Sequence, residues 1–383
     1  MASANDLVIA KNAKELATGF VFDQKLSDDF QSSISTDLLA QGFNDIDLTK
    51  VSKLAVNDVM HLNPNGKLAL SRDFEGTSTQ INADITAPGS DINLAARTTT
   101  IAEGVKVSAA GTFTNDRPGV AGQLSQPEAV NGGSINAGFL TLGKNVILDT
   151  SAGAWVDNRG VLKEGEAGNI KFGTLSKVDD SVSLQAYGFK QGGTLSVTFG
   201  SAGNEKTLNI AGNPNASATD IDIASNFFNK GGFSKIALSA QDVNIGDVAG
   251  APQEIYATAQ TLRMNAGFAS QASGQPMALV TAPVIQPDTT RKPVSLSFSA
   301  DKLGGVLTLA ENTTLRADRG GSVSLAAGKQ VNVLGDITTP SGTINISIND
   351  KDGSLAFDPT QAVFIGEKST LSAIGSSITL PDS

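Results

Sequence analysis

The stretch that decides the fold runs from residue 320 to residue 348 and reads GGSVSLAAGKQVNVLGDITTPSGTINISI. Apolar and polar residues alternate in three short runs within it: Val323-Ser324-Leu325, Val331-Asn332-Val333 and Ile344-Asn345-Ile346-Ser347-Ile348. Strict alternation over three to six residues predicts a β-strand with one buried face. Gly, Pro, Asn or Asp ends most of these runs, as is typical of turns. The stretch therefore predicts short strands separated by tight turns, repeated about every 20 residues.

The same pattern recurs along the chain. Val323 lies 21 residues before Ile344, and Ile170 lies 25 residues before Leu195. A period of this size with several short strands is typical of a solenoid, in which each unit buries its apolar face only by stacking on the next. We therefore expect an all-β, right-handed parallel β-helix (β-solenoid) with loop insertions. At this period the chain has room for roughly 15 to 18 coils.

Composition limits the function classes. Of the 383 residues 40% are hydrophobic, 5% are aromatic and 17% are charged, and the net charge is −10. No basic run is present, which argues against a nucleic-acid partner because phosphate contacts need clustered Lys and Arg. The absence of Cys excludes disulfides and thiol chemistry. With no visible signal peptide, the chain is expected to be a monomeric internal fragment of a longer protein.

The sequence also contains a duplication that is longer than the coil repeat. Three segments of the first half resemble three of the second: 38–48 with 226–238, 84–94 with 336–346, and 101–111 with 365–375. We predict a partly irregular leading segment at 1–36, a first β-helix module at 37–223 and a second at 224–383, continuous with the first. Phe43 and Phe227-Phe228 are expected to plug the core at the module starts.

Three strings carry a resemblance to a known family: residues 320–328 continuing through 331–333, 335–337 and 340–344, residues 109–119 followed by 132–135, and residues 149–156. They resemble filamentous haemagglutinin-like two-partner secretion exoproteins, which are large bacterial adhesins. This resemblance implies export through an outer-membrane pore partner to the cell surface of a Gram-negative bacterium, and a role in cell adhesion and biofilm. Asn63-Pro64-Asn65-Gly66 matches the family's secretion-domain motif, but Lys67 follows it and it lies inside the repeats. An ordinary turn is the other interpretation.

The expected function is a structural shaft of a secreted adhesin that projects binding loops toward other cells, a host or a matrix polysaccharide. One alternative is a β-helical polysaccharide-active enzyme, and another is the stalk of a contact-dependent toxin-delivery exoprotein. Paired carboxylates would favour the enzyme, but Asp179-Asp180, Asp220 with Asp222, and Asp350 with Asp352 are interpreted as turn or solvent-facing residues. The single histidine, His61, is interpreted as an exposed or turn-flanking residue and not as part of a Ser-His pair, and a count of one excludes a His-based metal site. We expect no enzyme, no cofactor and no metal.

Candidate binding residues lie in stretches that interrupt the strand pattern, at 112–131, 153–167 and 270–294. Trp155, the only tryptophan, is the leading candidate, because exposed aromatic side chains on loops stack on sugars or on partner proteins. Alternatively, Trp155 covers a seam between the loop and the shaft. The full set of candidates for an extracellular polysaccharide or a cell-surface receptor is Asn115, Asp116, Arg117, Trp155, Asp157 and Arg159.

Overall fold

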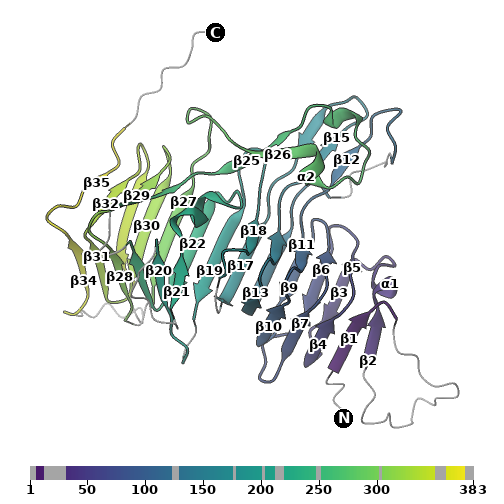
Figure 1. Ribbon diagram of the computed structural model, residues 1–383, viewed down its shortest axis with the longest axis horizontal. Helices are drawn as coiled ribbons and strands as arrows, with labels where there is room; N and C mark the ends of the chain where they lie inside the picture. The colour runs from purple at the N-terminus through teal and green to yellow at the C-terminus, as the bar shows by residue number, and fades with distance from the viewer. Residues whose placement is uncertain are drawn as a thin grey trace. The chain divides into compact units, whose positions relative to one another are not determined.

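The computed structural model describes residues 6–12, 32–122, 129–175, 178–200, 203–211, 220–246, 252–301, 304–349 and 359–375. Strands dominate these residues (Figure 1). The helical elements are α1 (Thr36–Leu39), η1 (Ser225–Asn229), η2 (Phe268–Ser270) and α2 (Met277–Val280). Among the described helices, none has the length and apolar character needed to cross a membrane. The chain divides into unit 1 (Met1–Gly168, Asp179–Leu184 and Ala269–Met277) and unit 2 (Asn169–Val178, Gln185–Phe268 and Ala278–Ser383).

Unit 2 contains three parallel sheets, and from β22 onward successive coils place one strand in each. The first sheet contains, in spatial order, β17 (Asn169–Leu175), β19 (Thr194–Phe199), β22 (Lys235–Ala240), β27 (Ser295–Ala300), β30 (Ser322–Ala327) and β33 (Thr343–Ile348). The second contains β21 (Ile221–Ile223), β20 (Thr207–Ile210), β23 (Asp242–Ile245), β28 (Val306–Leu309), β31 (Gln330–Val333) and β34 (Ala362–Ile365). The third contains β24 (Gln253–Ala257), β29 (Thr313–Ala317), β32 (Asp336–Thr338) and β35 (Leu371–Ser372).

Unit 1 follows the same principle with a split first sheet. One path contains β2 (Ser32–Ser35), β1 (Asp6–Ala10), β4 (Lys53–Val56), β7 (Ser78–Ile81), β10 (Thr98–Ile101) and β13 (Ser134–Leu142). A second path, β3 (Asp45–Leu48), β6 (Lys67–Leu70) and β9 (Asp91–Leu94), joins the first at β13. A further sheet contains β5 (Met60–His61), β8 (Ile85–Thr86), β11 (Lys106–Ser108), β14 (Ile147–Asp149) and β18 (Ser183–Gln185). Both units are therefore parallel β-helices, which confirms the expected fold class.

The register follows the sequence period. Val323 pairs with Ile344, and Ile170 pairs with Leu195, so the spacings of 21 and 25 residues are each one turn of the solenoid. Inward side chains such as Val323 and Leu325 are 0% exposed. Because a shift by one residue would turn every inward side chain outward, this alternation fixes the register.

Some expectations about the coils are wrong. The longest sheet path has six strands in each unit, so the described residues hold fewer coils than 15 to 18. Many residues that were expected to form further coils instead lie in excursions between coils. One excursion separates Lys235 of β22 from its direct partner in the next coil, Ser295 of β27. Phe43 is 48% exposed, because it lies in the turn before β3 and outside the interior. Phe228 is 1% exposed and packs edge-on against Phe298 at 5.8 Å, as expected of a core plug.

Matching segments of the duplication form matching elements. The segment 84–94 forms β8 and β9, and the segment 336–346 forms β32 and the start of β33. In each case a short strand is followed by a corner and a strand of the longest sheet. The borders at 223 and 224 stay a prediction, and most of the leading segment 1–36 lies outside the described residues.

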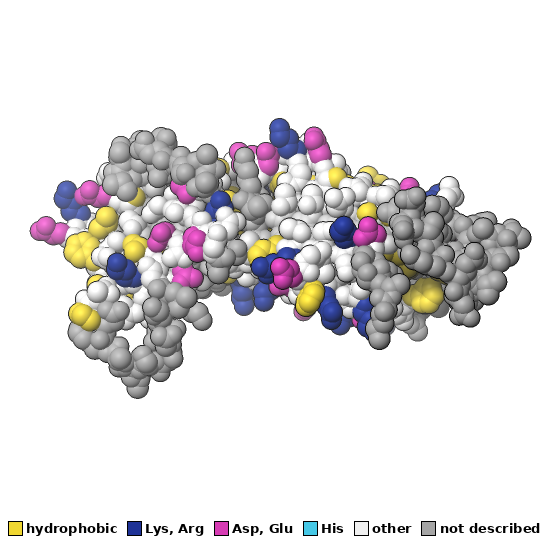
Figure 2. Space-filling model, turned by 90° about the horizontal axis from the view of Figure 1, so that it is seen from below, with side chains coloured by type: hydrophobic (Ala, Val, Ile, Leu, Met, Phe, Trp, Pro, Cys, Tyr) yellow, Lys and Arg dark blue, Asp and Glu magenta, His cyan; other side chains and the backbone are white. Residues whose placement is uncertain are grey.

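The last coil of unit 2 leaves apolar side chains uncovered. Val363 and Ile365 of β34 are 44% and 47% exposed, whereas their partners one coil back, Val331 and Val333, are 0% exposed. On the face drawn in Figure 2, Lys and Arg side chains are interspersed with Asp and Glu side chains rather than gathered in one basic patch.

Candidate functional site

Three short strands in unit 1 leave the coils and form a lateral sheet: β12 (Phe113–Asn115), β15 (Ala154–Val156) and β16 (Leu162–Glu164) (Figure 1). β12 and β15 are parallel, with Thr114 opposite Trp155. β15 and β16 are antiparallel, with Trp155 opposite Lys163. The stretches predicted as irregular loops at 112–131 and 153–167 therefore contain paired strands. The lateral sheet brings both groups of predicted binding residues together, although they are about 40 residues apart in sequence.

Two glycines allow this sheet to form. A Cβ atom on Gly111 would lie 2.3 Å from the backbone nitrogen of Gly153, and a Cβ atom on Gly153 would lie 2.4 Å from the carbonyl oxygen of Thr112. No real side chain fits at such distances, so the two backbones approach closely only because both residues are glycine. This approach places β12 and β15 in hydrogen-bonding contact, and the amide of Ala154 donates to Thr112 at 3.0 Å.

Trp155 is half-buried at the centre of this sheet. Its indole Nε1–H donates to Oδ2 of Asp116 at 2.7 Å. The ammonium of Lys163 lies 4.0 Å from the centroid of the indole ring, in cation–π contact. The ring is therefore held at its polar edge by a carboxylate and flanked by a cation. We call Asp116, Trp155 and Lys163, together with Arg117 and Arg159, the Trp155 surface.

The turn between β15 and β16 is organised by Asp157. Its Oδ1 accepts hydrogen bonds from the amides of Arg159 and Val161, both at 2.9 Å, and its Oδ2 lies 3.3 Å from the guanidinium of Arg159. The pKa of the Asp157 carboxyl is lowered below its ordinary value of 3.8, chiefly by the hydrogen bond from the Val161 amide. Burial of the carboxyl opposes this shift, and Arg159 adds to it. Gly160 has φ +83°, which completes the turn. Asp157 is 4% exposed, whereas the side chain of Arg159 is 77% exposed.

Asn115 and Arg117 contact a segment far along the chain, Ala269–Met277, which we call the strap. Asn115 is 0% exposed, and its amide donates to the carbonyl oxygens of Ala269 and Gln271. The guanidinium of Arg117 donates to the same Ala269 carbonyl at 3.0 Å. Asn115 was expected in an exposed loop, and the structure instead places it beneath the strap.

Sequence reasoning missed two residues of this region. Lys163 became relevant only through the antiparallel pairing of β15 and β16, which a hydrophobic period does not reveal. Ser273 of the strap accepts a hydrogen bond from the amide of Asn115 at 2.7 Å across a separation of 158 residues. No local sequence pattern predicts a contact between residues so far apart in the chain.

The residues weighed for catalysis and metal binding lie elsewhere. His61 is exposed beside the fully buried Met60, as expected. Asp179 forms a turn with Ser181, and Asp222 faces outward on β21, whereas Asp350 and Asp352 lie outside the described residues. Within the described part of the chain, no group of three His, Asp or Glu side chains is placed to hold a metal ion. The Asn63–Gly66 motif forms a turn with Asn65 at φ 60°.

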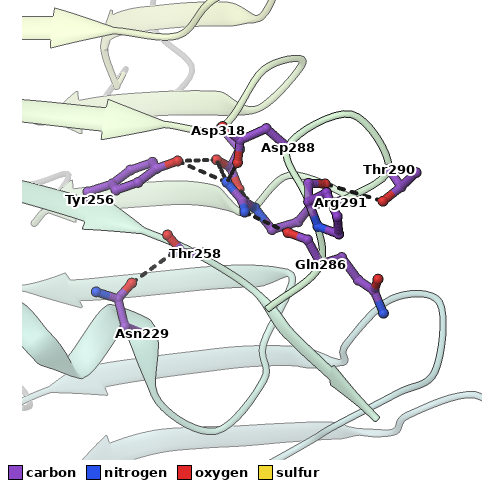
Figure 3. A network of polar contacts seen from close by, with 9 residues as sticks. Asn229, Tyr256, Thr258, Gln286, Asp288, Thr290, Arg291 and Asp318 are labelled. Carbon is purple, nitrogen blue, oxygen red and sulfur yellow. Dashed lines mark hydrogen bonds and ion pairs between the residues drawn. The ribbon is translucent and has the colours of Figure 1, made fainter. Parts of the chain in front are cut away.

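Unit 2 contains a second polar cluster, on its third sheet (Figure 3). The guanidinium of Arg291 makes two contacts with the carboxylate of Asp318, from Nε at 2.5 Å and from Nη2 at 2.6 Å. Arg291 also donates from Nη1 to the carbonyl oxygen of Gln286 at 2.8 Å, and from Nη2 to the hydroxyl of Tyr256 at 3.0 Å. The Tyr256 hydroxyl in turn donates to Asp318. The side chains of Arg291 and Asp318 are only 6% and 8% exposed.

This cluster stabilises the attachment of the chain after β26 to the third sheet. Burial, together with the hydrogen bond to Asp318, raises the pKa of the Tyr256 hydroxyl, and Asp318 raises the pKa of the Arg291 guanidinium. Both effects keep the protonated forms in place. Arg291 follows the hairpin of β25 (Gln260–Met264) and β26 (Thr281–Ile285), so its ion pair fixes the returning chain onto β29 before β27 begins.

The structure defines a class: a parallel β-helix that carries a lateral sheet with a tryptophan at its centre. No protein-family model, curated protein or solved structure matches the chain. The resemblance to filamentous haemagglutinin-like exoproteins rests on the quoted sequence strings alone.

Proposed function

We propose that this chain is the structural shaft of a secreted bacterial surface adhesin and that the Trp155 surface binds an extracellular polysaccharide or a cell-surface receptor. The observation that carries the proposal is the convergence of Asp116, Trp155 and Lys163 on a sheet that stands off the coils. The lateral sheet combines an aromatic ring with several charged donors and acceptors.

The chemistry of the Trp155 surface favours a sugar. A half-buried indole offers an apolar face to the C–H groups of a pyranose ring, and charged side chains hydrogen-bond to hydroxyls. Cations and anions balance across the lateral sheet: Arg117, Arg159 and Lys163 against Asp116, Asp157 and Glu164. An uncharged polysaccharide therefore fits better than a highly charged one, and its binding should depend little on salt.

Binding is favoured over cleavage because two carboxylates of the lateral sheet, Asp116 and Asp157, are already engaged. Asp157 accepts hydrogen bonds from its own turn, and Asp116 accepts one from Trp155. Glycoside hydrolysis needs two carboxyl groups free to act on the bond, one as an acid and one as a base or nucleophile. If the chain were instead the stalk of a toxin-delivery protein, it would act as a spacer, and the Trp155 surface would bind no ligand.

The experiment is a pull-down of the purified chain with neutral and acidic polysaccharides and with whole cells, with sugar release assayed in the same tubes. Trp155→Ala should weaken binding by about tenfold or more, as for aromatic hot spots. Phe74→Ala is the matched control, because Phe74 is 62% exposed and also carries a cation, Arg72, 5.5 Å from its ring centroid. Sugar release would overturn the adhesive function in favour of an enzyme. Equal binding by both variants would remove Trp155 from the site.

Export through an outer-membrane pore partner belongs to the same proposal. In a Gram-negative host that expresses the parent protein, co-expression of the pore should raise the fraction of Trp155-containing chain that an added protease digests on intact cells. An unchanged fraction would argue against two-partner secretion.

A further inference from the structure

Asn115 acts differently from the other residues predicted to bind a ligand. It is 0% exposed, so its side chain does not meet a ligand lying on the surface. A buried amide that lacks hydrogen bonds is costly, and this one has all of its groups satisfied. Its partners are the carbonyl oxygens of Ala269 at 3.1 Å and Gln271 at 2.7 Å, together with the amide of Arg117 at 3.2 Å.

The backbone of Asn115 is held as firmly as its side chain. The hydroxyl of Ser273 accepts from the Asn115 amide at 2.7 Å and donates to the Asn115 carbonyl oxygen at 3.0 Å. The next residue of the strap, Gly274, donates to the carbonyl oxygen of Phe113 at 2.9 Å. The strap thus docks on β12 as an added segment, with Asn115 at the centre of its contacts.

The strap contacts continue directly into the Trp155 surface. Asp116 follows Asn115 in the chain, and its amide donates to the carbonyl oxygen of Val156 at 2.8 Å. Its carboxylate then holds the indole of Trp155. One peptide bond therefore separates the residue that binds the strap from the residue that orients the ring.

We propose that Asn115 is a positioning residue: it docks the strap on β12, and the docked strap holds Asp116 and Trp155 in the arrangement that binds ligand. This inference rests on the proposed binding function of the same surface. It adds that ligand affinity and strap docking are linked. The apparent affinity of a ligand that needs the docked arrangement equals its intrinsic affinity multiplied by the fraction of molecules in which the strap is docked. By reciprocity, the bound ligand must stabilise the docked strap.

The test uses the full chain and the variants Asn115→Ala, Asn115→Asp and Ser273→Ala. Asn115→Asp keeps the side-chain shape but replaces the two amide donors with a carboxylate that faces carbonyl oxygens. The matched control is Asn265→Ala in the same hairpin, since the Asn265 amide donates to the Leu279 carbonyl oxygen at 3.2 Å. Hydrogen exchange of residues 269–277 reports docking. The emission of Trp155 reports its surroundings without a label, because the chain contains one tryptophan.

We expect Asn115→Ala and Asn115→Asp to speed exchange in the strap, shift Trp155 emission to longer wavelength and raise the dissociation constant of the polysaccharide about tenfold or more. Both remove the two hydrogen bonds that the Asn115 amide donates to the strap, and Asn115→Ala also removes the one accepted from the Arg117 amide. Ser273→Ala should give smaller changes in the same direction. Saturating polysaccharide should slow strap exchange in the unmodified chain. Asn265→Ala should leave all three measurements unchanged.

Two results would overturn the inference. Strap exchange that accelerates in Asn115→Asp while Trp155 emission stays unchanged would show that the strap is docked for stability alone. Ligand binding that leaves strap exchange unaltered would break the required reciprocity. If no polysaccharide binds the unmodified chain, the proposed function fails, and the emission and exchange measurements still decide whether the strap positions Trp155.

Discussion

The Arg291–Asp318 pair offers the sharpest test of the energetics of this fold. Asp318→Ala removes the carboxylate that contacts Arg291 at 2.5 and 2.6 Å, while the Arg291 side chain, only 6% exposed, stays buried. Removing one partner of a buried ion pair costs about 3 to 5 kcal/mol, because it leaves an uncompensated charge. The remaining contacts of Arg291, with the Gln286 carbonyl, the Tyr256 hydroxyl and the exposed Asp288, replace only part of this.

Hydrogen exchange measured by mass spectrometry is the appropriate assay, because a solenoid opens locally rather than as a whole. A loss of 3 kcal/mol corresponds to exchange roughly 100-fold faster in the segment around Arg291. Lys368→Ala is the control, since its contact with Glu311 is at 3.6 Å and the two side chains are 85% and 54% exposed. Such surface pairs contribute about 0 to 1 kcal/mol.

A double variant separates charge from packing. Arg291→Met combined with Asp318→Leu removes both charges while keeping most of the volume, so it should recover most of the stability that Asp318→Ala loses. If Asp318→Ala exchanges no faster than Lys368→Ala, the reasoning from buried charge is refuted. A double variant as unstable as the single one would assign the loss to packing.

Three further predictions concern the lateral sheet and the core. Because the pKa of Asp157 is lowered in the folded chain, the stabilisation of the turn by Asp157 is complete above the ordinary pKa of 3.8 and is lost as the pH falls below it. Trp155 emission should therefore change on acidification to about pH 3. Asp157→Asn should make that change smaller. Gly153→Ala, whose Cβ would meet backbone at 2.4 Å, should lower the melting temperature, whereas Gly375→Ala, with open space, should not. Leu325→Ala should cost about 2 to 5 kcal/mol in urea unfolding, since Leu325 is 0% exposed, and a cost below about 1 kcal/mol would contradict its place in the interior.

The coils could be predicted from sequence because their register is written in local alternation. Val323 and Ile344 pair one coil apart, as their spacing indicated. A strand with one buried face tolerates no other register, so period and pairing carry the same information. The number of coils could not be predicted, since the long excursion between β22 and β27 has no length set by the repeat.

The candidate site was predictable only in part. Trp155 stood out by residue type and Asp116 only as a residue of a predicted loop, and their contact depends on the close approach at Gly111 and Gly153. The strap was not predictable as a partner of Asn115, because its contacts span 154 to 158 residues and carry no pattern. Interactions set by tertiary placement of irregular segments leave no period in the sequence.

The stacking of coils also governs how unit 2 would respond to tension along its own stack. In this unit each strand of the longest sheet bonds only to the strands one coil before and after it, so a pulling force loads one ladder of hydrogen bonds at a time. When a coil such as that between Val323 and Ile344 detaches, its 21 residues extend to about 70 Å, whereas the stacked coil had occupied about 4.8 Å. A β-helix built in this way gains contour length in steps while the remaining coils stay folded, and it absorbs mechanical work as it extends.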